Sequence, residues 1–71
     1  EPGASPDVLS AREREVLRYL ALGYTQREIG EVLFISEKTV ETHKSRLMAK
    51  LGLEKRSELV RYAFEKGIVD L

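Results

Sequence analysis

The chain has 71 residues, in which 12 lysines and arginines balance 12 aspartates and glutamates, with one histidine and no cysteine. Such a length gives one domain, near the lower limit at which an apolar core alone supports a fold. The lack of cysteine excludes a disulfide framework and a thiolate metal site, and no apolar run approaches the ~20 residues of a membrane span. We expect a cytoplasmic domain with no cofactor, no metal and no membrane contact.

The predicted elements are all helices, because no strand-like alternation persists in the chain. Residues 1–8 have linker composition, which we interpret as the tail of an upstream regulatory domain, and residues 9–71 form the folded domain. Ser10 and Glu13 make a capping box that opens the first helix, and Gly23 ends it. The expected fold is an all-α bundle of four helices, at about 10–22, 26–33, 37–51 and 56–66.

The second and third helices are predicted to form a helix-turn-helix. Thr25 opens the second helix with a capping box, Ser36 caps the third, and only two residues separate the helix end from the second cap. A turn that short makes the third helix cross the second steeply. Gly30 is a poor helix former, and we expect it to let the third helix cross closely at Val40.

The third helix carries an apolar stripe and an opposite polar face. Val40, Leu47 and Leu51 fall on one line at ~100° per residue, so they must face the core. The outer side holds short or cationic side chains of the kinds that read base edges in the major groove, although plain solvation of an outer face is the alternative. The candidate base contacts are Lys38, Glu41, Thr42, Ser45 and Arg46.

Positive charge is concentrated in the segment that holds the third helix. Residues 1–35 carry a net charge of −2, residues 36–56 carry +3, and residues 57–71 carry −1. Phosphates are commonly held by helix N-termini with nearby hydroxyl or cationic groups. The candidate phosphate contacts are Thr25, Gln26, Arg27, Ser36, Thr39, Arg56 and Ser57, with His43 either packed or facing a phosphate. Each of these residues has a competing role as a cap or a surface residue.

The fourth helix has more apolar surface than one core needs. Val60 and Phe64 form a second stripe beside the one that closes the bundle. Two interpretations stay open. Either the tail residues Ile68, Val69 and Leu71 cover this stripe, or it pairs with a second copy of the chain. An isologous pair would place two recognition helices about one DNA turn apart.

Most of the chain resembles the C-terminal DNA-binding domain of the LuxR family, particularly response regulators of the NarL/FixJ type. The matching segments are LSAREREVL from Leu9, GYTQREIG from Gly23, ISEKTVETH from Ile35 and KLG from Lys50. The resemblance implies a helix-turn-helix domain whose third helix enters the major groove of double-stranded DNA. It also implies a homodimer through the fourth helix and an upstream regulatory domain, most often a phosphorylated receiver. RNA polymerase is a further candidate partner.

The resemblance assigns roles to individual positions. Base-reading positions are Lys38, Glu41, Thr42 and Ser45, and phosphate contacts are Thr25, Gln26, Thr39, His43 and Arg56. Many members of the family have lysine or arginine where this chain has Glu41. The base specificity of relatives therefore does not carry over to Glu41.

Two other functions compete with this interpretation. Region 4 of a sigma factor resembles residues 9–40, although Thr42 and His43 stand where sigma factors usually carry serine and arginine. A protein-interaction module that has lost DNA binding is supported only by the zero net charge. An enzyme is not expected, because the chain has one histidine, no cysteine and no phosphate-binding glycine loop.

Overall fold

The computed structural model describes residues 8–69, and these residues form four helices. They are α1 (Ala11–Ala21), α2 (Gln26–Leu33), α3 (Glu37–Leu51) and α4 (Arg56–Glu65). The all-α prediction is confirmed. Two of the predicted helices include residues that prove to be caps: Ser10 and Leu22 flank α1, and Lys66 follows α4. The linker predicted for residues 1–8 lies almost entirely outside the described residues.

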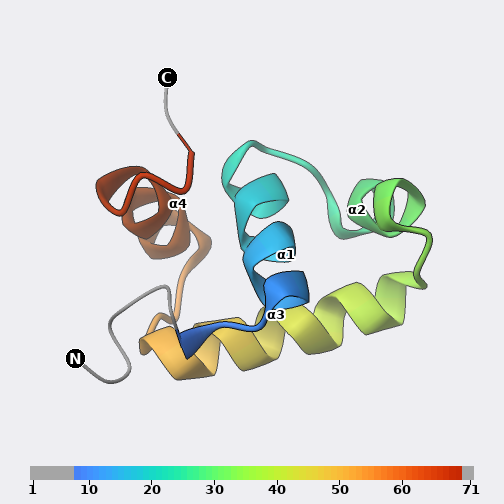
Figure 1. Cartoon of the computed structure of the whole chain (residues 1–71), viewed down its shortest axis with the longest axis horizontal. Helices are drawn as coiled ribbons and strands as arrows, with labels where there is room; N and C mark the ends of the chain where they lie inside the picture. Colours follow the sequence, from blue (N-terminus) through green and yellow to red (C-terminus); the bar gives the residue numbers. More distant parts are fainter. Residues whose placement is uncertain (1–7, 70–71) are drawn as a thin grey trace.

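The first helix stands at the centre of the arrangement (Figure 1). It packs across α3, and α2 and α4 lie on its two sides. The α2 helix sits over the N-terminal half of α3, whereas α4 lies toward the other end of α3 and packs on α1. Because only the turn at residues 34–36 joins them, α2 and α3 form a helix-turn-helix.

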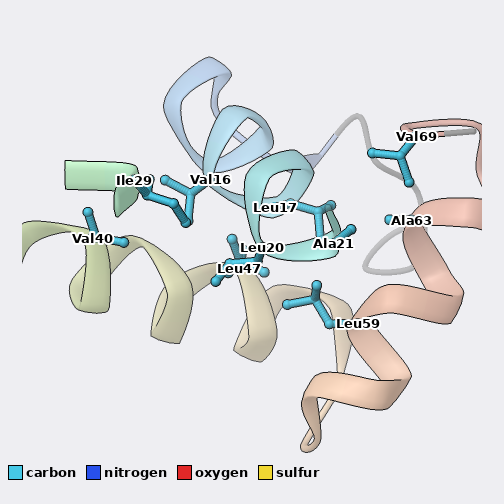
Figure 2. Close-up of a cluster of buried hydrophobic side chains, with 10 residues drawn as sticks. All are labelled: Val16, Leu17, Leu20, Ala21, Ile29, Val40, Leu47, Leu59, Ala63 and Val69. Carbon is cyan, nitrogen blue, oxygen red and sulfur yellow. The ribbon is translucent and has the colours of Figure 1, made fainter. Parts of the chain in front are cut away.

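The core explains why α1 is central (Figure 2). Val16, Leu17, Leu20 and Ala21 follow the i, i+1, i+4, i+5 spacing of one helical face and point at the three other helices. The complete set of buried apolar residues is Val16, Leu17, Leu20, Ala21, Ile29, Val40, Leu47, Leu59, Ala63 and Val69. The predicted core stripe of α3 is confirmed at Val40 and Leu47, and Leu51 is half-buried.

The turn between α2 and α3 depends on two residues. Phe34 ends α2 in a left-handed conformation with φ of 60°, and its side chain is 93% exposed. Gly30 lies where a Cβ atom would stand 2.7 Å from the carbonyl oxygen of Ile35 and 3.5 Å from the backbone nitrogen of Glu37. The predicted close approach at Gly30 is real, but Val40 was the wrong partner. The glycine makes room for the turn itself, because the chain reverses directly over it.

Candidate nucleic-acid interface

The outer face of α3 presents all five predicted base-reading positions to solvent. They are Lys38, Glu41, Thr42, Ser45 and Arg46, and each is exposed. On the opposite side of the helix, Val40 and Leu47 are 0% exposed. Burial of the apolar stripe therefore sets the rotation of α3 about its axis, and this rotation directs the polar side chains outward.

Glu41 lies at the centre of a small hydrogen-bonded group that joins α2 to α3. The Nε2 atom of Gln26 donates a hydrogen bond of 2.6 Å to Oε1 of Glu41. The hydroxyl of Ser45 donates to Oε2 of the same carboxylate at 3.3 Å. The structure thus brings together a predicted phosphate contact, Gln26, and two predicted base contacts.

Thr42 occupies the exposed face one residue beyond Glu41. Its hydroxyl donates to the backbone carbonyl of Lys38 at 3.2 Å, which leaves the methyl group and the oxygen lone pairs for an outside partner. Among residues 8–69, the side chains of Lys38 and Arg46 have no hydrogen-bond or ion-pair partner. Their cationic groups can therefore reach acceptors on another molecule without breaking a contact within the domain.

The N-termini of α2 and α3 are both capped by exposed hydroxyls. Thr25 Oγ1 accepts from the amide of Glu28 at 3.1 Å, and the Glu28 carboxylate accepts the Thr25 amide at 2.9 Å. Ser36 Oγ accepts from the amide of Thr39 at 3.0 Å and lies 2.8 Å from the Thr39 hydroxyl. These caps use the third amide of each helix, so the first two amides remain available to an anion.

His43 is half-buried on the flank of the core stripe. Its Nδ1 atom is buried and has no hydrogen-bond partner among the described residues. In folded proteins, buried N–H groups without an acceptor are rarer than buried acceptors without a donor, which indicates that an unpaired donor costs more free energy. The proton of neutral His43 therefore belongs on Nε2, the nitrogen that can donate to an acceptor outside the domain.

Arg56 and Ser57 begin α4, and both are exposed. One guanidinium nitrogen of Arg56 donates to the carbonyl oxygens of Leu20 at 2.8 Å and Tyr24 at 3.0 Å. From the sequence, Arg56 was predicted to be a phosphate contact or a surface residue, and these two bonds to backbone carbonyls were not predicted. Arg56 ties the start of α4 to the end of α1 and to the loop that leads into Thr25.

A second missed feature is an ion pair between α1 and α3. Lys50 Nζ lies 2.8 Å from Glu13 Oε1, and Glu13 is only 4% exposed. The hydrogen bond from Lys50 lowers the pKa of Glu13 below its ordinary value, together with the Ser10 amide and against burial, which raises it. The available signal was the position of Glu13, three and four residues before Val16 and Leu17, on the face that α1 buries.

The remaining predicted residues take less central positions. Arg27 makes an exposed ion pair of 3.7 Å with Glu31. Val60 and Phe64 are half-buried and pack against the core of their own chain. The tail folds back on α4, since the amides of Ile68 and Val69 donate to the Ala63 carbonyl and Val69 is 5% exposed. Leu71 lies outside the described residues.

The described part of the chain holds no cluster of three or more histidine, cysteine, aspartate or glutamate side chains arranged for a metal ion. Within residues 8–69, no helix has the length and apolar character needed to cross a membrane.

Known proteins similar to this chain are transcriptional regulators. Residues 7–63 match the family of bacterial regulatory proteins of the luxR type. The oxygen regulatory protein NreC of Staphylococcus aureus (strain JH9) is 51% identical over 63 residues, which are 89% of this chain and 29% of NreC. The chain therefore spans less than a third of the length of the curated relatives it matches.

Solved structures agree with that match. The DNA-binding domain of the Erwinia amylovora RcsB protein has a TM-score of 0.82 and 34% identity, covering 96% of this chain and 78% of that one. Full-length FixJ from B. japonicum has a TM-score of 0.80 and 34% identity, covering 90% of this chain and 32% of that one.

The family match favours the LuxR-type interpretation over the sigma-factor alternative, and the family consists of DNA-binding regulators rather than enzymes. The four helices, the exposed polar face of α3 and the match over most of the chain lead to one conclusion. The chain belongs to the LuxR family of bacterial regulatory proteins, as a helix-turn-helix DNA-binding domain similar to the C-terminal domains of NarL/FixJ-type response regulators.

Proposed function

We propose that this domain binds double-stranded DNA in a sequence-specific manner by placing α3 in the major groove. Lys38, Glu41, Thr42, Ser45 and Arg46 then read base edges. The backbone phosphates are held by Thr25, Gln26, Arg27, Ser36, Thr39, His43, Arg56 and Ser57. The observation that carries the proposal is the exposed outer face of α3, bordered by two hydroxyl-capped helix N-termini.

The chemistry of this face supports base reading. Thr42 offers a methyl group for thymine, and Lys38 and Arg46 offer donors for guanine, because their side chains have no partner within the described residues. The caps of α2 and α3 support phosphate binding, since each leaves two amides directed along the helix axis toward an anion. His43 supports it as a donor through Nε2, because its Nδ1 atom is buried.

The test separates a base reader from a phosphate contact. Thr42→Ala should cost about 1–3 kcal/mol on the preferred sequence and relax preference mainly at one base pair. Arg27→Ala should weaken binding to all sequences alike and make the log–log salt dependence shallower by about 1. Arg27 serves this purpose better than Arg56, because Arg56 also holds two backbone carbonyls of its own domain.

Both results follow from one docking orientation. Selection of bound duplexes from randomised DNA, repeated at two salt concentrations, measures them together. If Arg27→Ala shifted the preferred sequence while Thr42→Ala left it unchanged, α3 would not lie in the groove as proposed.

We further propose that the domain acts as a homodimer on a two-half-site operator, with α4 as the contact. Val60 and Phe64 support this contact because they stay partly exposed although the tail already folds onto α4. Val60→Arg should reduce affinity for a duplex with two half-sites more than for one half-site. Equal losses on both duplexes, with an unchanged sedimentation profile, would show that the stripe serves only its own chain.

The longer relatives support the last part of the proposal. We infer that the domain is the effector of a cytoplasmic two-component response regulator with an upstream receiver domain. RNA polymerase as a partner stays a hypothesis drawn from the family resemblance. Sequencing of the gene upstream of Glu1 tests the receiver directly.

A further inference from the structure

The carboxylate of Glu41 is held unusually well for an exposed side chain. An exposed glutamate ordinarily samples several rotamers, and fixing it costs conformational entropy. Here both carboxylate oxygens accept a hydrogen bond, one from Gln26 on α2 and one from Ser45 a helical turn further along α3. The 2.6 Å bond from Gln26 is short, as expected when the acceptor is charged.

The chemistry of the held group restricts what it accepts from DNA. An ionised carboxylate is an acceptor only, so it needs a donor on the base. In the major groove, cytosine presents its N4 amino group, whereas guanine and thymine present acceptors and adenine places the N7 acceptor beside its amino group. A fixed carboxylate at this position therefore fits cytosine best.

We propose that Gln26 is a positioning residue for base recognition, which holds the Glu41 carboxylate so that it selects cytosine. This inference rests on the proposed function, namely that α3 lies in the major groove. Gln26 acts through Glu41 and not by reading a base itself.

Gln26 also links base recognition to the DNA backbone. A carboxamide nitrogen has two hydrogens, and Glu41 takes one of them. The other is available to a phosphate oxygen at the N-terminus of α2, where the amides of the first turn also favour an anion. One side chain thus stands between a phosphate and a carboxylate, two groups that otherwise repel each other, and donates to both.

The test is a double-mutant cycle on the 71-residue chain. The variants are Gln26→Ala, Glu41→Gln and the double variant, with Glu37→Gln as the matched control. Glu37 is an exposed glutamate in the first turn of the same helix, so its replacement changes the net charge equally. Preferred duplexes are first selected from randomised DNA, and affinity is then measured for the four base pairs at the position that Glu41 faces.

The wild-type chain should prefer cytosine there by about tenfold, within the range expected for one base contact. Glu41→Gln should abolish that preference, and Gln26→Ala should reduce it to about twofold while leaving preferences at other positions intact. In the Glu41→Gln background, Gln26→Ala should change preference no further. Glu37→Gln should leave the preference unchanged.

Four results would overturn the inference. If Gln26→Ala lowered the affinity but kept the cytosine preference, Gln26 would be a phosphate contact alone. A preference for guanine or thymine at the Glu41 position would contradict the acceptor argument. A third result is that Thr42→Ala changes the sequence preference while Gln26→Ala and Glu41→Gln leave it unchanged. That result would overturn this inference and leave the proposed function standing. A wild-type chain without salt-sensitive, sequence-dependent binding would remove both.

Discussion

Two glutamates make contacts with side chains of another helix, one near each end of α3, and the two contacts differ in burial. Glu13 of α1 is 4% exposed and accepts the ammonium of Lys50 at 2.8 Å near the end of α3. Glu41 is exposed and accepts the amide of Gln26 at 2.6 Å near the start of α3. The first contact joins α1 to α3 beside the core. The second joins α2 to α3 at a solvent-exposed position.

Burial explains why the Glu13 contact matters for stability and the Glu41 contact for recognition. A buried carboxylate that loses its cation keeps the cost of desolvation, so breaking the pair at Glu13 destabilises the fold. An exposed carboxylate that loses its donor regains water at little cost, so the group at Glu41 adds little stability. Because it is exposed and has acceptor sites to spare, it can accept a further donor from another molecule while Gln26 still holds it.

Lys50→Ala should have the largest effect. It leaves the Glu13 carboxylate buried with the Ser10 amide as its remaining hydrogen-bond donor among the described residues. Removal of one partner from a fully buried pair costs about 3–5 kcal/mol, and we expect about 2–3 kcal/mol here because the Lys50 side chain is 42% exposed. Urea unfolding followed by circular dichroism measures the loss. A change below ~0.5 kcal/mol, the usual size of a surface effect, would place Glu13 in the same class as Glu41.

Gly30→Ala should have a smaller effect that is confined to the other end of α3. The new Cβ atom would stand 2.7 Å from the Ile35 carbonyl oxygen, so the turn between α2 and α3 must shift. Overpacking of this kind costs about 1–3 kcal/mol, partly offset by the better helix propensity of alanine. Thermal unfolding measures the stability, and DNA titration measures the displaced interface. The control is Val32→Ala, an uncharged and exposed position two residues further along α2. Equal behaviour of the two variants would refute the close approach as the cause.

Acid should weaken the fold through Glu13. The Lys50 contact, together with the Ser10 amide, lowers the pKa of Glu13 in the folded state below its ordinary value of 4.5. The pair therefore contributes its full stability above pH 4.5 and loses it as the pH falls through the lower, folded pKa. Denaturant unfolding between pH 7 and pH 3 should show this loss.

Glu13→Gln should reduce the acid dependence, because glutamine does not titrate. The pKa of Glu58 is also lowered, by hydrogen bonds from the amides of Glu54 and Lys55, so Glu58→Gln is the necessary comparison. A profile that Glu13→Gln leaves unchanged would assign the acid sensitivity elsewhere.

Glu41→Gln should have the smallest effect on stability. Its carboxylate is exposed, and an exposed polar substitution changes the free energy of unfolding by about 0.5 kcal/mol or less. The same urea experiment provides the measurement beside Lys50→Ala. A loss comparable to that of Lys50→Ala would mean that the Gln26 bond holds α2 in place, and the contrast between the two glutamates would fail.

The residue pattern alone predicted the four helices and the caps of the first three. Ser10, Thr25 and Ser36 cap helices at the predicted positions because capping is a local interaction between residues three apart. The core stripe of α3 was predictable as well, since the helical period places Val40 and Leu47 on one side of the helix whatever it packs against. Once that side was buried, the exposed face with Lys38 and Thr42 followed.

The side-chain contacts between helices could not be predicted from the residue pattern. Gln26 and Glu41 are 15 residues apart, Glu13 and Lys50 are 37 apart, and Arg56 reaches the Leu20 carbonyl across 36 residues. No periodicity within one helix encodes these distances, because they depend on the angles at which α2, α3 and α4 pack on α1. The partner of Gly30 was mispredicted for the same reason: a missing Cβ signals a close approach, but the path of the turn selects the atom that approaches.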